Sequence, residues 1–255
     1  MCGIFAYVGS NPQAAKKAVR GLKDLEYRGY DSWGVVAKTP HGLVSRKGVG
    51  KISAVSEDDF SDIEGSISVG HTRWATHGAV CIKNTHPHFN TEETLAVVHN
   101  GIIENYRELR EKLGTRLFRS ETDTEVIPHL IDSFMRRGMS FESAFVRACR
   151  MLKGRFAFVA VHKDFPFVLS ARRGSPLVVG KGEGEYYLAS DVPAFLDYTS
   201  SVYFINDGEY VKILPEETSF FNFETGNKIK KKEEKISWNK ADASKGGWDH
   251  FMLKE

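Results

Sequence analysis

Alternating and continuous runs of apolar residues predict strands toward both ends of the chain, and amphipathic segments predict helices between them. The expected early strands cover residues 2–9, 33–38, 43–48, 66–74 and 94–101. The expected later strands cover residues 155–163, 167–173, 176–182, 185–191, 202–207, 209–214 and 219–223. The pattern therefore predicts two groups of strands on either side of a group of helices.

Helices are expected at residues 14–28, 104–114, 122–138 and 140–154. The third carries Thr122 followed by Glu125, which is the spacing of a capping box at a helix start. Strands and helices fall into groups and do not alternate, which argues against a doubly wound parallel sheet. We therefore predict an α+β fold in which mainly antiparallel sheets pack together and are covered by helices.

Composition and charge exclude several classes of protein. The 255 residues are 41% hydrophobic and 27% charged, which is ordinary for a globular chain. The net charge of only +2 offers no broad basic surface, so no nucleic-acid partner is expected. No apolar run approaches the ~20 residues that cross a bilayer, and the amino terminus lacks the pattern of a secretory signal. We expect no membrane partner and a cytoplasmic location, with one domain over residues 1–240 and the start of a linker at 241–255.

The three cysteines are Cys2, Cys81 and Cys149, and they are too far apart and odd in number for a disulfide framework or a zinc cluster. We expect no metal, and we expect Cys149 in the core of an amphipathic helix. Cys2 is different because removal of Met1 would leave its thiol beside a free α-amine. An amine that titrates near ~8 can accept the thiol proton, so one residue would supply both nucleophile and base.

Polar residues gather where two of the expected strands end. Arg73, in the segment from Gly70 to Gly78, offers a planar fork of donors suited to a carboxylate, and Thr76 and His77 could add hydrogen bonds. A surface loop with an ordinary ion pair is the alternative interpretation of this segment.

Asn100 and Gly101 end the next expected strand. An amide side chain followed by an approachable backbone N–H could form an oxyanion hole, although Asn-Gly is also a common tight turn. Asp123 stands at an expected helix start and could bind an ammonium group, whereas Glu121 and Glu125 are expected to serve the helix terminus. Arg28, at the end of the first helix, is placed to hold neighbouring carbonyls or an asparagine side chain.

Taken in order, these motifs resemble the class II glutamine amidotransferases, a family with an amino-terminal cysteine nucleophile. The resemblance covers nearly the whole chain, and more narrowly it is similar to the glutaminase half of those members that aminate a sugar phosphate. It is carried by Cys-Gly-Ile, Leu-Glu-Tyr-Arg-Gly-Tyr-Asp-Ser, His-Thr-Arg-Trp-Ala-Thr-His-Gly, His-Pro-His, Val-His-Asn-Gly-Ile-Ile-Glu-Asn, Ser-Glu-Thr-Asp-Thr-Glu and Gly-Ser-Pro-Leu.

The resemblance implies a four-layer αββα sandwich of the type found in N-terminal-nucleophile hydrolases. It also implies hydrolysis of the glutamine side-chain amide through a thioester on Cys2, without a cofactor. The implied roles are Cys2 as nucleophile, Asn100 and Gly101 as oxyanion hole, Arg28 as an orienting residue, Arg73, Trp74, Thr76, His77 and Asp123 around glutamine, and His86 and His99 as supports beneath the site.

The implied partners are L-glutamine as substrate and a second, sugar-isomerising half that acts on fructose 6-phosphate, in a full-length enzyme that is a homodimer. Trp33 departs from the family, which usually has a small residue there, and this departure raises the question of packing behind the site. Two alternatives stay open: a catalytically inert module that senses glutamine, and an amino-terminal-cysteine hydrolase of another amide. The first has no need of a nucleophile, and the second has no reason to carry both Arg73 and Asp123.

Overall fold

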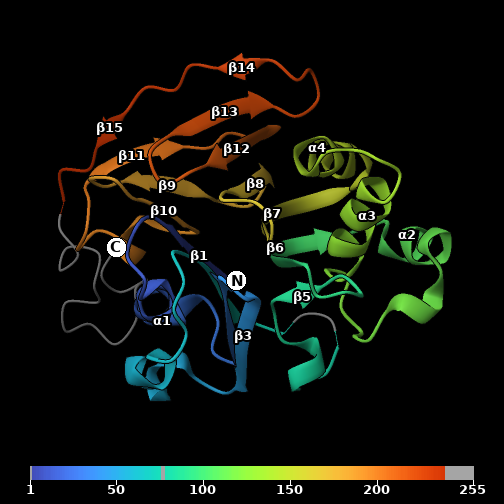
Figure 1. Ribbon diagram of the computed structural model, residues 1–255, viewed down its shortest axis with the longest axis horizontal. Coiled ribbons are helices and arrows are strands. Elements are labelled where there is room, and N and C mark those ends of the chain that lie inside the picture. Colours follow the sequence, from blue (N-terminus) through green and yellow to red (C-terminus); the bar gives the residue numbers. More distant parts are fainter. Residues whose placement is uncertain (1, 76–77, 239–255) are drawn as a thin grey trace, which may run out of the picture.

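Two antiparallel sheets form the centre of the computed structural model, which describes residues 2–75 and 78–238 (Figure 1). The first sheet has the order β15-β11-β9-β10-β1-β4-β2-β3. Its strands are β1 (Gly3–Val8), β2 (Ser32–Thr39), β3 (Gly42–Val49), β4 (Ile67–Arg73), β9 (Val178–Lys181), β10 (Tyr186–Ala189), β11 (Ser201–Phe204) and β15 (Glu234–Lys235).

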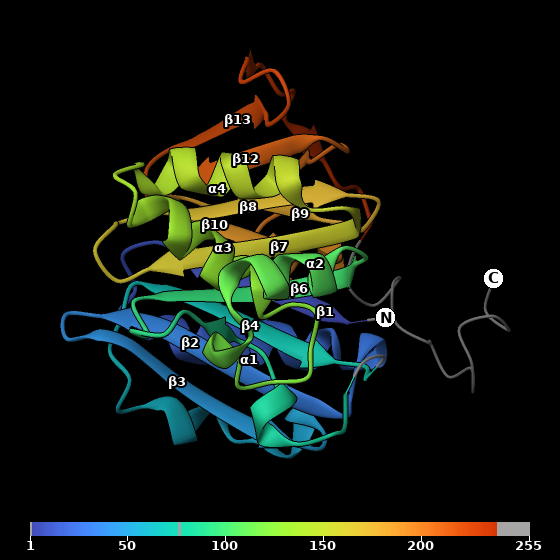
Figure 2. The same ribbon diagram turned by 90° about the vertical axis from the view of Figure 1, so that its right-hand side faces the viewer.

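The second sheet has the order β14-β13-β12-β8-β7-β6-β5. Its strands are β5 (His88–Phe89), β6 (Leu95–Ile103), β7 (Gly154–His162), β8 (Val168–Arg173), β12 (Glu209–Ile213), β13 (Thr218–Asn222) and β14 (Lys228–Ile229). The helices are α1 (Ala14–Asp24), α2 (Tyr106–Leu113), α3 (Val126–Met135) and α4 (Phe141–Met151). Figures 1 and 2 show α1 outside the first sheet and the other three helices beside the second.

The alternating side chains of β1 explain why this strand is buried on both faces and its sheet forms an inner layer. Ile4, Ala6 and Val8 lie in the core between the two sheets, whereas Phe5 and Tyr7 lie in the core that packs on α1. All five are at most 1% exposed, so both faces of the strand are removed from water. A third core joins α3 and α4 to the outer face of the second sheet. The predicted α+β fold with four αββα layers is thus confirmed.

One local prediction is wrong. Thr122 and Glu125 do not form a capping box, and α3 begins at Val126 with no side-chain cap. The Glu125 carboxylate accepts instead from the backbone N–H and the hydroxyl of Ser120, at 2.7 and 2.6 Å. Thr122 Oγ1 lies 3.0 Å from His88 Nε2, so Thr122 has a tertiary partner while Glu125 is held by a residue just before the helix.

Three further residues singled out in the sequence can be placed in the structure. Glu121 does not serve a helix terminus, because its carboxylate pairs with Lys83 at 2.7 Å. Trp33 packs edge to face on Phe60, within the core that covers α1. Cys149 is fully buried, as predicted.

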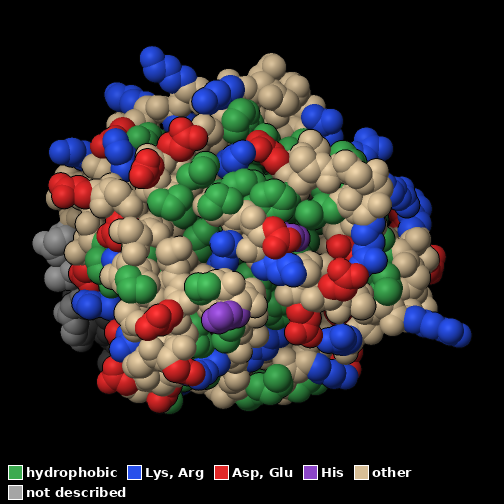
Figure 3. Space-filling view, viewed as in Figure 1, with side chains coloured by type: hydrophobic (Ala, Val, Ile, Leu, Met, Phe, Trp, Pro, Cys, Tyr) green, Lys and Arg blue, Asp and Glu red, His purple; other side chains and the backbone are tan. Residues whose placement is uncertain are grey.

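The surface and the chain end add little to the site. No helix in the described part of the chain has the length and apolar character needed to cross a membrane. Figure 3 shows basic and acidic side chains interspersed on the face seen in Figure 1. The expected linker at 241–255 lies outside the described residues.

Candidate active site

The pairing of β1 with β4 brings Cys2 beside Arg73. These strands are antiparallel with Gly3 opposite Thr72, so the start of β1 lies next to the end of β4. The end of β6, with Asn100 and Gly101, approaches from the second sheet. Residues that are far apart in sequence thus meet at one edge of the sandwich.

The Cys2 thiol lies against the backbone of Trp74. The Trp74 N–H donates to Sγ at 3.3 Å, and the thiol faces the Trp74 carbonyl oxygen at 3.5 Å. Burial raises the pKa of the Cys2 thiol, and the Trp74 N–H and the charge of Arg73 offset this only in part. A thiol in this position stays protonated at neutral pH, so it needs a base before it can act as a nucleophile.

Two side chains hold the carbonyl oxygen of Cys2. Asn100 Nδ2 donates to it at 2.9 Å, and Arg28 Nε donates at 3.1 Å. The second hydrogen of the Asn100 amide goes to Ser190 Oγ at 2.8 Å. Asp191 lies 3.6 Å from the Arg28 guanidinium and compensates its charge. Arg28 therefore has the orienting position expected for it, and Asn100 is fixed with its nitrogen toward Cys2.

Gly101 occupies a position that only glycine can fill. Its φ of +122° lies in the left-handed region, and a Cβ there would stand 2.0 Å from the carbonyl oxygen of Arg155. Gly101 and Cys2 line the same cavity. Glycine thus places no side chain beside the backbone at this wall of the cavity.

Arg73 and Asp123 are both buried and line one small cavity with Cys2. The Arg73 guanidinium donates to the carbonyl oxygens of Ala79 and Gly78, at 3.3 and 3.4 Å. Asp123 accepts from the backbone N–H of Ile103 at 2.7 Å. The cavity, of about 20 Å³, has room for one water molecule at most, so a larger molecule enters only if the walls separate.

A second, larger cavity of about 470 Å³ is also lined by Cys2, together with Arg28, Asn100 and Gly101. Trp74 lines both cavities, is 43% exposed, and packs against Tyr30 with ring centroids 5.4 Å apart. Trp74 thus borders both spaces, and its role as a cover stays a prediction. Thr76 and His77, also expected near glutamine, lie outside the described residues.

His86 and His99 line the small cavity, and their supporting role stays a prediction. Thr124 Oγ1 lies 2.8 Å from His99 Nδ1 and 3.5 Å from His86 Nε2. The sequence interpretation missed two neighbours of Asn100, namely Ser190 and His71. His71 precedes Arg73 by two residues on β4. A polar residue so close to a candidate site residue in a buried strand is the sequence feature that could have identified it.

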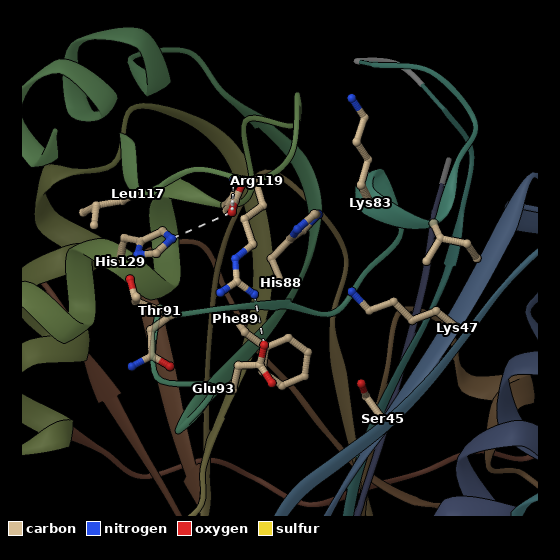
Figure 4. Close-up of a pocket in the computed structure, with 13 residues that line it drawn as sticks. Ser45, Lys47, Lys83, His88, Phe89, Thr91, Glu93, Leu117, Arg119 and His129 are labelled. Atoms are coloured by element: carbon tan, nitrogen blue, oxygen red, sulfur yellow. Dashed lines mark hydrogen bonds and ion pairs between the residues drawn. The ribbon is translucent and has the colours of Figure 1, made fainter. Parts of the chain in front are cut away.

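A third cavity, of about 340 Å³, lies apart from Cys2 (Figure 4). Lys47 and the Arg119–Glu93 ion pair line it, and His88 connects its wall to the residues under the site. No group of three or more potential metal ligands occurs within residues 2–75 and 78–238.

The Cys2 region combines a candidate nucleophile with amide donors, a buried cation and a buried anion. This arrangement is suited to acyl transfer from an amino acid amide.

Comparison with known proteins identifies the class. Residues 71–197 match a glutamine amidotransferase domain family. A solved structure, glutamine phosphoribosylpyrophosphate amidotransferase from B. subtilis with ADP and GMP, matches 87% of this chain and 49% of its own, with a TM-score of 0.76 and 29% identity. The chain belongs to the class II glutamine amidotransferases and has their N-terminal-nucleophile fold.

The sequence relatives define a narrower group. The glutamine–fructose-6-phosphate aminotransferase (isomerizing) of Methanothermobacter thermautotrophicus is 48% identical over 259 residues, and that of Thermococcus kodakarensis is 47% identical. Each match spans the whole of this chain and 43% of the relative. The domain is thus homologous to the glutaminase part of these proteins, and the chain spans less than half of their length.

Proposed function

We propose that this chain hydrolyses the side-chain amide of L-glutamine to glutamate and ammonia, with Cys2 as the nucleophile. The observation that carries the proposal is the small cavity that Cys2, Arg73 and Asp123 line together, with Asn100 hydrogen-bonded to the Cys2 carbonyl beside it. A thiol alone would suit many amides, but a buried cation and a buried anion beside it select a substrate with a carboxylate and an ammonium group.

The first step is activation of the thiol. Once Met1 is removed, the α-amine of Cys2 accepts the thiol proton, and the thiolate attacks the carboxamide carbon of glutamine. The negative charge moves to the amide oxygen, where the Gly101 N–H and the Asn100 amide stabilise it. Collapse of this tetrahedral intermediate breaks the C–N bond, and the protonated α-amine returns its proton to the departing ammonia.

The second step is hydrolysis of the glutamyl thioester. Water adds to the thioester carbon with the α-amine as base, the C–S bond breaks, and glutamate leaves while the thiol is restored. Arg28 keeps the Cys2 backbone in place through its bond to the carbonyl oxygen. No metal or organic cofactor is needed for either step.

The amino acid end of glutamine is bound by charge. Arg73 would exchange its bonds to the Gly78 and Ala79 carbonyls for the α-carboxylate, and Asp123 would take the α-ammonium group. Thr76 and His77 would add contacts from the adjoining loop, and Trp74 would cover the bound substrate. Because the cavity is small, binding must be accompanied by separation of its walls.

The larger context follows the relatives. Their names couple glutamine to fructose 6-phosphate, and they are more than twice as long as this chain. We infer that ammonia released here is used by a sugar-isomerising second half to aminate fructose 6-phosphate, in a homodimeric enzyme. The larger cavity is also lined by Cys2, and Arg73 and Asp123 do not line it, so it would give ammonia a way out apart from the amino acid pocket.

Steady-state release of glutamate from glutamine tests the proposal, with asparagine as the substrate control and Cys2→Ala as the protein control. We expect glutamate from glutamine only, and none from the variant. Glutamine binding without turnover in the unmodified chain would instead support a sensing module. Faster hydrolysis of another amide would support a different amidohydrolase.

A further inference from the structure

The edge of the second sheet is left uncovered next to the candidate oxyanion hole. β5 pairs with β6 only at Ala96 and Val97, so within residues 2–75 and 78–238 no strand pairs with the part of β6 from His99 onward on that side. Both backbone polar groups of one residue point to the same edge of an antiparallel strand. Those of His99 point to the uncovered edge, where unpaired buried groups would be costly.

Two imidazoles take the place of the missing strand. His86 Nδ1 accepts from the His99 N–H at 3.2 Å, and His71 Nε2 lies 3.0 Å from the His99 carbonyl oxygen. The two rings are stacked, with centroids 3.9 Å apart and planes 9° from parallel. Each ring therefore fixes the other while it satisfies one backbone group of His99.

The same His71 nitrogen also lies 3.1 Å from Asn100 Oδ1. Since both neighbours of Nε2 are oxygen acceptors, Nε2 must carry the hydrogen and donate to both. This bond fixes the orientation of the Asn100 amide with its oxygen toward His71. The nitrogen is thereby directed toward the Cys2 carbonyl, next to the thiol.

We propose that His71, braced by His86, is the positioning residue that orients the Asn100 amide for stabilisation of the oxyanion. The inference rests on the proposed glutaminase function. His71 touches neither the thiol nor the small cavity, so its effect on catalysis is transmitted through Asn100. Gly101 follows on the same uncovered edge, so the clamp on His99 also steadies the backbone that presents the Gly101 N–H.

The role of His71 does not involve proton transfer. Burial lowers the pKa of His71 to about 3, and the same cause lowers the pKa of His86 well below its usual value. Both rings stay neutral over the range in which the enzyme would operate. A neutral donor of fixed orientation is what the arrangement requires.

The test compares His71→Phe with His162→Phe, the same exchange at a buried histidine of β7 that packs on Phe141 and Phe165. We expect His71→Phe to lower kcat for glutamine hydrolysis by about tenfold or more, with KM changed by less than about threefold. The shape of the pH profile should not change. His71→Gln, which restores a side-chain N–H, should recover part of the loss, and His162→Phe should retain the wild-type kcat.

The double variant His71→Phe/Asn100→Ala separates positioning from general damage. If His71 acts through Asn100, the double variant is no slower than Asn100→Ala alone. Losses that multiply, or a wild-type kcat in His71→Phe, would overturn the assignment. His71→Asn, which is too short to reach both acceptors, replaces His71→Phe in the same comparison if the latter does not fold. Absence of turnover in the unmodified chain would count against the proposed function itself and is recognised before any variant is made.

Discussion

The Asn100 side-chain nitrogen lies 2.9 Å from the carbonyl oxygen of Cys2, so one side chain holds the backbone of the candidate nucleophile. The contact joins the first sheet to the second at the point where the reaction would occur. Both hydrogens of the amide are used, since Ser190 Oγ accepts the other at 2.8 Å. The Asn100 hydrogen that points at the Cys2 carbonyl would also donate to the oxyanion formed when the amide carbon of glutamine is attacked.

Asn100→Ala removes that hydrogen. Loss of one oxyanion-hole donor costs ~2.7–4 kcal/mol of transition-state stabilisation, so we expect kcat to fall about 100- to 1000-fold. Bound glutamine, measured by calorimetry, should lose little affinity. Ser190→Ala is the matched control: it removes the second partner of the amide and the acceptor of the Ile4 N–H but leaves the hydrogen directed at Cys2, so it should lose far less activity. An Asn100→Ala protein with wild-type kcat would reduce Asn100-Gly101 to a structural turn.

Arg73→Ala and Asp123→Ala each remove one charge that addresses the amino acid end of glutamine. A charge-assisted hydrogen bond contributes ~1.5–3 kcal/mol, so we expect KM to rise roughly 10- to 100-fold, with a smaller change in kcat. Initial rates over a range of glutamine concentrations measure both. Arg119→Ala serves as the control, because that arginine is exposed and pairs with Glu93. Unchanged KM in both test variants would rule out the assignment.

Gly101→Ala tests the close approach at the oxyanion hole. The new Cβ would lie 2.0 Å from the Arg155 carbonyl oxygen, and the φ of +122° is strained for alanine. The backbone must shift, so we expect kcat to fall by about tenfold or more, because misplacement of about 1 Å is enough for such losses. Gly114→Ala is the control, since its φ of +96° is strained as well but nothing lies within 4 Å. Equal activities in the two variants would contradict the role of the Gly101 N–H.

The buried histidines make stability depend on pH. Burial lowers the pKa of His71, His86, His88 and His99. Below ~6.5 the unfolded chain binds protons at these positions while the folded chain does not, so the stability that is complete above this pH is lost as the pH falls. We expect the free energy of unfolding to drop by roughly 3–5 kcal/mol between about pH 7.5 and about pH 5.5. Denaturant titrations measure it, and a flat profile would show that the histidines protonate within the fold.

Much of the fold could be predicted because its signals are local. The alternation of apolar residues marked β1, β6 and β7, and the turn residues marked the hairpin between β2 and β3. The order of the strands in each sheet could not be predicted, since it depends on pairings between distant segments such as β1 with β10. The failed capping box has this cause only in part, because Thr122 contacts the distant His88 whereas the Glu125 carboxylate is held by the nearby Ser120.

The candidate site shows the same division. Cys2, Arg73 and Asn100 could be singled out by residue type and position at strand ends. The bond between Asn100 and the Cys2 carbonyl could not, because it requires the register of two sheets. His71 was missed because a histidine in a buried strand looks like an ordinary core residue until the uncovered edge of β6 is known.

The central claim is that the Cys2 thiol is the nucleophile and that the α-amine of the same residue is its base. An acylated Cys2 nitrogen is an amide and cannot accept the thiol proton, so a chain that retains Met1 or any extension should be inert. The most direct measurement combines intact mass, glutaminase rate and the site labelled by an electrophilic glutamine analogue on one preparation. We predict an active protein whose mass lacks one methionine and whose label is on Cys2. Full activity in protein shown to retain Met1, or a label on Cys81 or Cys149, would contradict the account.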